Sequence, residues 1–186
     1  MKNILSKIIS LFFLIILSPV LLMVSFFIAI DDGLPILFKQ RRIGKNNNHF
    51  WIYKFRTMKK DTPNIATHLL HNEGSFYTTI GPFLRKLSLD ELPQLINILK
   101  GDMKFIGPRP ALYNQDDLVL LRTKTGIHNL MPGVTGWAQV NGRDELSIPD
   151  KVKMDEFYLK NESLWLDVKI LLMTISKVFK MEGVSQ

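Results

Sequence analysis

The sequence of 186 residues contains no cysteine. That absence excludes a disulfide framework, a thiolate metal site and a cysteine nucleophile, and it suits a reducing compartment. The glycine-bearing segments at 107 and 133–142 have neither the Walker spacing nor a GxGxxG pattern, so nucleotide-binding loops of those types are excluded. No histidine has a third ligand at a metal-binding spacing. We interpret all of them as structural or solvent-facing: His49, His68, His71 and His128.

Charge is absent from one long apolar run, Ile8 to Ile30, which spans 23 residues. At a rise of about 1.5 Å per residue, a straight helix of this length would just cross a bilayer core. Ser18 and Pro19 lie near its midpoint. Because proline cannot donate a backbone hydrogen bond, the helix should kink or break there. The sequence therefore predicts a re-entrant helix that enters the membrane and leaves on the same side.

The charges that flank this run favour the same topology, because cytoplasmic flanks are enriched in Lys and Arg. Lys2 and Lys7 precede the run. The basic residues that follow it are Lys39, Arg41, Arg42 and Lys45. A single span is the second interpretation, but it would place one basic flank outside. A signal peptide is the third, but the run is longer than a usual signal core and no A-x-A-like cleavage site follows it.

The net charge of +7 is concentrated just after the apolar run. Residues 31–60 hold eight Lys or Arg and two Asp, a net +6, whereas residues 61–186 hold fourteen basic and fifteen acidic residues, a net −1. Such a patch can bind anionic lipid, nucleic acid or the phosphates of a substrate at the membrane surface. Because a membrane anchor argues against nucleic acid, we expect membrane lipid as a partner and no nucleic acid.

Hydrophobic periodicity predicts few strands. Residues 50–57 alternate aromatic and β-branched residues with basic ones, which predicts a strand, and residues 59–80 are polar and turn-rich. Residues 88–100 have an apolar face at helical spacing. Ser88 and Glu91 fit a capping box for this helix, and Gly101 fits its stop.

The second half of the chain is predicted to be mainly helical. Further helices are expected at 111–125, 150–160 and 163–181, and the last is amphipathic and suited to a membrane interface. GPRP at 107–110 predicts a rigid non-helical elbow, and PGVTG at 132–136 predicts a turn before the short apolar stretch WAQV. The expected fold class is mainly α with minor β. A re-entrant membrane helix hairpin, residues 1–36, would precede a compact cytoplasmic α/β domain with interfacial amphipathic helices, residues 37–186.

Two adjacent carboxylates, Asp90 and Glu91, lie at the start of the predicted helix 88–100. Acidic residues in a first turn ordinarily cap free N–H groups and complement the helix dipole. Arg85 before them, Asp102 after the helix and Arg109 between two prolines favour a further role. Carboxylate, arginine and Mg²⁺ form the usual apparatus for phosphoryl transfer, and a carboxylate can itself become an aspartyl phosphate.

Several blocks together resemble the bacterial sugar transferases, the monotopic phosphoglycosyl transferases that begin glycoconjugate assembly on a lipid carrier. The most specific is LSLDELPQLINILKGDMKFIGPRP at 87–110. The other matching blocks follow the family's order over essentially the whole chain: SP at 18–19, FKQRRIG at 38–44, IYKFRTM at 52–58, PGVTGWAQVNGR at 132–143 and LDVKILL at 166–172. The chain most resembles small members such as bacillosamine-phosphate transferases. Some of these have Ala-Arg-Pro where this chain has FKQRRIG, so Arg41 and Ile43 inherit no role.

The resemblance implies transfer of a sugar 1-phosphate from a UDP-sugar, expected to be an N-acetylated amino sugar, to undecaprenyl phosphate. Mg²⁺ is the implied cofactor, UMP is released, and the location is the cytoplasmic face of the bacterial inner membrane. Asp90 matches the family's nucleophile and is the expected metal-binding carboxylate, and Glu91 matches the residue that helps to activate the lipid phosphate. The other matched positions are phosphate-binding Arg85 and Arg109, nucleotide-sugar-binding Gln139, Asn141 and Arg143, and the helix break at Ser18 and Pro19.

Two other functions remain as hypotheses. In a non-catalytic membrane adaptor, Asp90 and Glu91 would only cap a helix and the basic stretch would bind anionic lipid. A different phospho-aspartyl enzyme, such as a phosphatase, would carry the signature DxDxT/V, which the sequence lacks. Release of UMP from a UDP-sugar separates a transferase from an adaptor.

Overall fold

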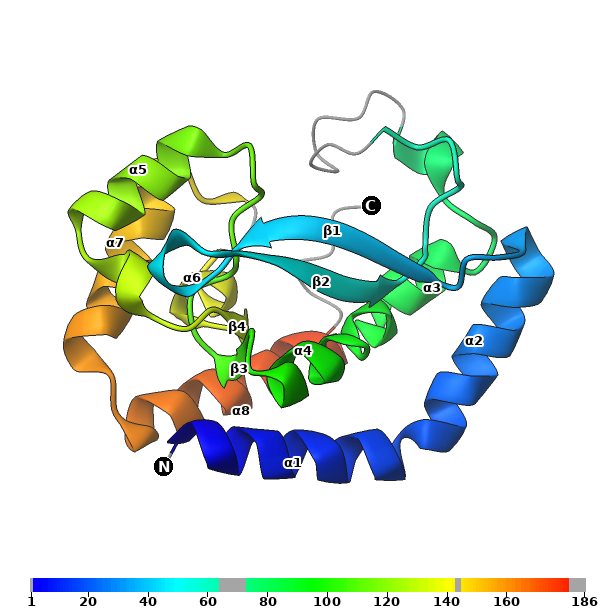
Figure 1. Ribbon diagram of the computed structural model, residues 1–186, viewed down its shortest axis with the longest axis horizontal. Helices are drawn as coiled ribbons and strands as arrows, with labels where there is room; N and C mark the ends of the chain where they lie inside the picture. Colours follow the sequence, from blue (N-terminus) through cyan, green and yellow to red (C-terminus); the bar gives the residue numbers. More distant parts are fainter. Residues whose placement is uncertain (1, 64–72, 143–144, 181–186) are drawn as a thin grey trace.

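The computed structural model describes residues 2–63, 73–142 and 145–180, and its fold is mostly helical (Figure 1). The chain begins with α1 (Lys2–Ile16) and α2 (Ser18–Asp32), a pair bent by 62°. The break falls at Leu17, so that Pro19 lies in the first turn of α2, and Ser18 Oγ donates to the Ile15 carbonyl at 2.7 Å. The predicted break of the apolar run is confirmed.

The bent pair is apolar on its outer side and attached to the rest of the protein on its inner side. Within the described ranges, no single helix is long and apolar enough to cross a membrane, whereas α1 and α2 meet that length and composition test together. On the inner side, the buried Ser10 Oγ donates to the Leu95 carbonyl at 2.6 Å. Exposed apolar side chains on the outer side include Ile4, Ile8, Phe12, Leu22, Phe26 and Ile30.

The end of α2 is tied to the segments that follow. Arg56 is buried, and its Nη2 donates to the carbonyls of Asp32 at 2.9 Å and Gly33 at 2.6 Å. The same nitrogen lies 3.0 Å from the Asp32 carboxylate. Asp31 Oδ2 accepts from the Ile80 amide at 3.1 Å. Packing therefore continues across the predicted boundary at residue 36, and the division into residues 1–36 and 37–186 stays a prediction.

Two small sheets make up the β-structure. β1 (Leu37–Ile43) and β2 (His49–Phe55) form an antiparallel hairpin in which Gln40 lies opposite Ile52. The strand predicted at 50–57 is confirmed as β2. β1 was not predicted, because its basic residues interrupt the apolar alternation. In the second sheet, β3 (Lys104–Ile106) pairs in parallel with β4 (Gly133–Thr135), where the sequence predicted only a turn.

The helix predicted at 88–100 is interrupted. After α3 (Gly81–Lys86) comes the 3₁₀ helix η4 (Leu89–Glu91), and α4 begins only at Gln94 and ends at Lys100. Ser88 adopts a left-handed conformation with φ 55° and makes no capping hydrogen bond, so the predicted capping box is wrong. A capping serine needs extended backbone. Pro93, which has no N–H to donate, lies at the start of α4.

The helical expectations for the second half hold in part. The remaining helical segments are η1 (Lys45–Asn47), η3 (Glu73–Phe76), α5 (Asp116–Lys124), η5 (Ile127–Asn129), α6 (Trp137–Val140), α7 (Ile148–Asn161) and α8 (Leu164–Lys180). α7 and α8 confirm the predictions at 150–160 and 163–181. α5 starts later than the predicted residue 111 because the Ala111 carbonyl accepts from Ile43 in β1 at 2.9 Å. The fold class, mainly α with minor β, is confirmed.

Asn97 of α4 joins that helix to the edge of β2 that faces away from β1. Its side chain is fully buried, and Oδ1 accepts from the Tyr53 amide at 3.0 Å while Nδ2 donates to the Trp51 carbonyl at 2.7 Å. One amide side chain thus makes the two hydrogen bonds that a neighbouring strand would make. Without it, the Tyr53 amide and the Trp51 carbonyl would lack these partners. The consequence is that η4, which leads into α4, lies close to β2.

Replacing Asn97 should destabilise the protein strongly. In Asn97→Ala two backbone groups of β2 lose their partners, at a cost of about 1–3 kcal/mol each. Denaturant unfolding in detergent micelles measures the change. The matched control is Asn161→Ala, which removes one exposed bond to the Phe157 carbonyl and should change stability by no more than about 0.5 kcal/mol. Equal effects of the two substitutions would contradict this role of Asn97.

Candidate active site

The two adjacent carboxylates occupy the single turn of η4. Asp90 is buried, with 7% of its surface exposed, and the Glu91 side chain is 13% exposed. The left-handed Ser88 redirects the chain after α3, so that both acids precede α4 instead of capping it. Burial of two neighbouring acids costs free energy unless cations lie close to them.

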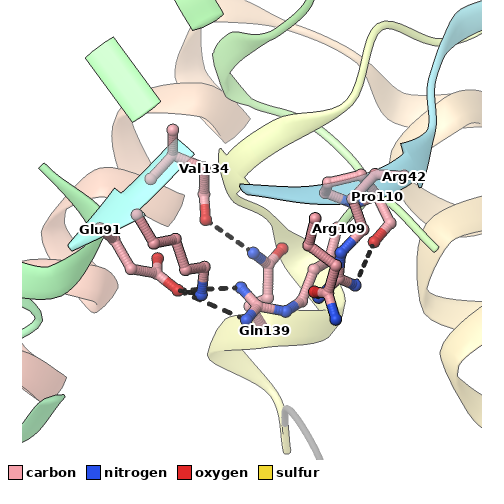
Figure 2. Close-up of polar contacts among 8 residues, drawn as sticks. Arg42, Glu91, Arg109, Pro110, Val134 and Gln139 are labelled. Atoms are coloured by element: carbon pink, nitrogen blue, oxygen red, sulfur yellow. Dashed lines mark hydrogen bonds and ion pairs between the residues drawn. The ribbon is translucent and has the colours of Figure 1, made fainter. Parts of the chain in front are cut away.

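Two cations from distant parts of the chain converge on one oxygen of Glu91. Lys54 of β2 places Nζ 2.7 Å from Glu91 Oε1. Arg109 directs Nη1 and Nη2 to the same oxygen, each at 3.4 Å (Figure 2). The Glu91 carboxylate is therefore held between a strand and the 107–110 elbow. An ammonium has three N–H donors and a guanidinium has five, so groups of these kinds can contact more than one anion.

A third cation, Arg85, lies at the end of α3. Its Nη1 donates to the Tyr77 hydroxyl at 2.8 Å, and its guanidinium lies 5.1 Å from the centre of the Tyr77 ring. Arg85 also acts electrostatically on Asp90. The structure thus brings Arg85, Arg109 and the acidic pair into one charge cluster, and the phosphate-binding role of the two arginines stays a prediction.

Burial dominates the protonation of this cluster. It raises the pKa of Asp90, with the charge of Lys54 opposing the rise, Glu91 adding to it, and the two arginines opposing it. Burial also lowers the pKa of Lys54, against the attraction of Glu91. A carboxylate surrounded in this way is desolvated but compensated by cations, and such a group is a candidate nucleophile or general base.

The elbow that carries Arg109 is held by close backbone contact. Pro108 and Pro110 have no N–H, so these residues cannot donate to a continued β3 ladder. A residue that precedes proline also avoids helical backbone, which applies here to Gly107 and Arg109. The Gly107 amide donates to Thr135 and the Gly133 amide donates to Pro108, at 2.9 and 3.0 Å. A Cβ at either glycine would collide with the backbone of the other segment, so the close approach requires glycine.

A cleft of about 510 Å³ opens beside the cluster. Glu91, Arg109 and Gln139 contribute its polar groups near the acidic pair, and its apolar lining includes Leu92, Leu95, Phe105, Val134 and Val140. Gln139 Nε2 donates to the Val134 carbonyl at 2.8 Å (Figure 2), and Gln139 Oε1 is buried with no hydrogen-bond partner among the described residues. A cleft with an apolar lining and a few convergent polar groups is the usual form of a small-molecule site.

The other predicted residues have different outcomes. Asn141 does not line the cleft, and its Nδ2 donates to the Trp137 carbonyl at 2.8 Å, at the end of α6. Arg143 lies outside the described residues. Asp102 accepts from Asn97 at 3.2 Å and lies 3.7 Å from Lys100, so its partners belong to α4 rather than to the cluster.

The donor set fits Mg²⁺ only in part. The described part of the chain has no group of three or more His, Asp or Glu side chains that could hold a metal ion. Mg²⁺ is commonly held by one or two carboxylates together with substrate phosphates. Asp90 and Glu91 can supply that protein share, and a diphosphate would have to supply the rest.

Lys54 is the site residue that sequence reasoning missed. It lies within the IYKFRTM block, but that block was used only for the resemblance. The available signal was a lysine inside an otherwise apolar and aromatic strand, since a buried lysine needs an anionic partner. Its partner Glu91 lies 37 positions later, so the pairing is set by tertiary structure.

Comparison with known proteins shows the family of this chain. The family model described as bacterial sugar transferase matches residues 1–181. Over 178 residues the chain is 43% identical to an uncharacterized sugar transferase, EpsL, of Bacillus subtilis, an alignment covering 95% of this chain and 86% of that protein.

Two further relatives are named for the reaction they catalyse. An undecaprenyl-phosphate glucose phosphotransferase of Komagataeibacter xylinus is 40% identical, with 90% of this chain and 34% of that protein aligned. A UDP-N-acetylgalactosamine-undecaprenyl-phosphate N-acetylgalactosaminephosphotransferase of Aeromonas hydrophila is 38% identical, over 87% of this chain and 39% of that protein. The chain therefore spans well under half of these two longer relatives.

These matches define the class of protein as a transferase. The chain belongs to the bacterial sugar transferase family.

Lys54→Met should impair activity and shift its pH dependence. The substitution removes the cation that most opposes the rise of the Asp90 pKa, so Asp90 should keep its proton to higher pH. If ionised Asp90 is required, kcat/KM falls by about a hundredfold or more, and the acid limb of the pH profile moves to higher pH.

Two variants serve as controls for this experiment. Lys54→Arg keeps the charge and should keep the position of the acid limb. Lys100→Met removes a half-exposed lysine that pairs with Asp102, and it should leave the limb unchanged. An unshifted limb in Lys54→Met would refute the electrostatic role of Lys54.

Proposed function

We propose that this protein transfers a sugar 1-phosphate from a UDP-sugar to undecaprenyl phosphate through a covalent phospho-sugar on Asp90. The observation that carries the proposal is the buried Asp90 within a cluster of Lys54, Arg85 and Arg109. Its neighbour Glu91 and Arg109 line the adjacent cleft. The names of the relatives supply the acceptor and the kind of group transferred. The structure supplies a carboxylate with the surroundings of a nucleophile.

In the first half-reaction, a carboxylate oxygen of Asp90 attacks the phosphorus linked to the sugar. The bond from that phosphorus to the bridging oxygen breaks, and UMP leaves with the electron pair. The cations reduce repulsion between the carboxylate and the diphosphate, because charges in a partly desolvated site interact more strongly than in water. Of the three cations in the cluster, Arg109 is the one that lines the cleft, and it is proposed to contact the transferred phosphoryl group.

In the second half-reaction, an oxygen of undecaprenyl phosphate attacks the same phosphorus. The acyl-phosphate bond to Asp90 breaks, which restores the carboxylate and yields the lipid diphosphate sugar. Glu91, which contacts Lys54 and Arg109, is proposed to accept a proton from the acceptor phosphate. Both half-reactions thus use one buried site in turn.

Mg²⁺ bound by Asp90 and the donor diphosphate would supply further charge neutralisation. Gln139 is proposed to contact the nucleotide-sugar, since the residue lines the cleft and its buried Oε1 has no hydrogen-bond partner among the described residues. Asn141 and Arg143 keep only the role that the resemblance implies. An N-acetylated amino sugar is the first donor to test, because the chain resembles the small members of the family.

The proposed location is the cytoplasmic face of the bacterial inner membrane, with α1 and α2 as a re-entrant hairpin. This follows from the bend at Ser18-Pro19, the exposed apolar outer side of the pair and its basic flanks. We also propose that α8 lies in the interface, because one side of it exposes Leu164, Trp165, Val168, Leu171, Leu172 and Ile175. In Figure 1, α1 runs along the lower edge, and α8 starts above its N-terminal end and rises behind α4.

Asp90→Asn should fold but release no UMP. Wild-type enzyme given a UDP-sugar without lipid acceptor should release up to one UMP per enzyme, and intact-mass analysis should show a sugar-phosphate adduct. Asp90→Asn is close in size but lacks the nucleophilic carboxylate, so both signals should vanish. Asp102→Asn, which removes a carboxylate outside the cluster, is the matched control and should keep both signals.

The result also separates the competing hypotheses. An adaptor would release no UMP with any donor in a panel of UDP-sugars. Substantial turnover in Asp90→Asn, or an adduct on another residue, would instead show that the nucleophile is assigned wrongly.

The hairpin topology can be tested by labelling, because the chain has no native cysteine. Asn3→Cys should be protected from an impermeant thiol reagent added outside intact cells, and it should react after the membrane is opened. Replacing both Ser18 and Pro19 by Leu should straighten the helix and make the same cysteine accessible from outside. Labelling from outside in the protein with native Ser18 and Pro19 would refute the hairpin.

A further inference from the structure

The elbow around Arg109 is held by hydrogen bonds to its carbonyls from separate elements. The Pro110 carbonyl accepts from Arg42 Nη1 at 3.0 Å (Figure 2). The carbonyl of Arg109 itself accepts from Arg122 Nη1 of α5 at 2.8 Å. These two guanidiniums fix the backbone on which the Arg109 side chain is mounted, and neither is part of the charge cluster.

Arg122 is in turn held by Asp155 of α7. Its Nε and Nη2 donate to Asp155 Oδ2 at 3.0 and 2.6 Å, and Asp155 is 1% exposed. Replacing a buried ion pair by apolar side chains is often neutral or stabilising, so stability alone is a weak reason for one. Here the pair leaves one guanidinium nitrogen, Nη1, in a fixed direction, and that nitrogen meets the Arg109 carbonyl.

Side-chain packing alone does not lock the elbow. A cavity of about 30 Å³ borders Pro108, Arg109, Pro110 and Arg122. The elbow therefore has space for a small displacement, and the contacts of the Arg109 guanidinium with Glu91 are already long, at 3.4 Å. A shift of the Arg109 backbone would move its charge relative to the acidic pair.

We propose that Arg122, oriented by Asp155, is a positioning residue that sets the place of the Arg109 guanidinium in the cleft. Arg122 touches no substrate and acts through the backbone of Arg109. The inference rests on the proposed function for its kinetic consequence, since Arg109 is there the cation that contacts the transferred phosphoryl group. The pairing of α5 with α7 thereby becomes part of the catalytic geometry.

A double-mutant cycle on the rate of UMP release tests this role. Arg122→Lys keeps a positive charge beside Asp155 but cannot donate to both Asp155 and Arg109 in the same geometry. It should lower kcat about tenfold or more while KM changes little, as expected when a transition-state contact is misplaced. In the Arg109→Ala background, where no side chain remains to be positioned, the same substitution should change kcat by less than about twofold.

Two variants accompany the cycle. Asp155→Asn removes the charge that orients Arg122 at nearly constant volume, and it repeats the cycle if Arg122→Lys does not fold. Glu156→Gln removes an exposed ion pair with Lys160 from the adjacent position of α7, and it should leave kcat unchanged. If the losses from Arg122→Lys and Arg109→Ala multiply, the pair has a merely structural role and the proposal is overturned.

A second readout does not depend on the enzyme's activity. Hydrogen exchange followed by mass spectrometry should show faster exchange in residues 104–113 of Arg122→Lys and Asp155→Asn, and unchanged exchange in the hairpin of β1 and β2. Unchanged exchange at 104–113 overturns the positioning role. Wild-type protein that releases no UMP from any donor would instead overturn the proposed function, while the exchange result would still decide whether the elbow is held by Arg122.

Discussion

The site depends on the compensation of two adjacent acids that lie almost out of contact with water. Asp90 is 7% exposed, and its neighbour Glu91 adds repulsion to the cost of desolvation. No single segment could provide enough positive charge beside them without placing like charges next to each other. The cations instead come from β2, from the end of α3 and from the elbow. The relative placement of these three segments is therefore the main demand that the site makes on the fold.

Each of these placements has a local physical cause. Asn97 docks α4 on the edge of β2 and so sets the distance between Lys54 and Glu91. The left-handed Ser88 turns the chain between α3 and η4, which lets Arg85 and Asp90 share one cluster. Close backbone contact at glycines, together with paired prolines, holds the elbow against β4. Each of these features would cost free energy in isolation: the left-handed serine, the buried amide and the irregular elbow. Each persists because the surrounding contacts hold it in place.

The sequence was sufficient where structure is set locally. Proline in the apolar run predicted the break between α1 and α2, periodicity predicted α7 and α8, and two prolines predicted the irregular elbow. The predictions from the sequence were wrong where a contact with a residue far away in the sequence determines the local structure. Ser88 and Glu91 have the residue types and spacing of a capping box, yet Glu91 is engaged by Lys54 and Arg109 instead. β1 likewise depends on its pairing with β2, and the late start of α5 depends on the hydrogen bond from Ile43 to Ala111.

The sequence likewise predicted only part of the candidate site. The resemblance named Asp90, Glu91, Arg85 and Arg109, and the structure places these four in one cluster. Lys54 was missed because its partner is 37 residues away, and Asn141 has its contact within α6 rather than in the cleft. Motif blocks identify which segments take part, but they do not say which side chain of a block faces the site.

The bent pair of α1 and α2 also contacts the lining of the cleft and the segments that carry the cations. Ser10 of α1 is bonded to the Leu95 carbonyl, and Leu95 is also part of the cleft lining. Phe13 of α1 packs edge-on against Phe105, another residue of that lining, with ring centres 6.4 Å apart. At the other end, Asp31 and Asp32 bind the segments that lead to Arg85 and Lys54. A helix pair in contact with a membrane would in this way fix the depth of the cleft, because α1 contacts Leu95 and Phe105 of the cleft lining. An acceptor whose phosphate lies at the surface and whose chain lies in the bilayer requires that kind of fixed depth.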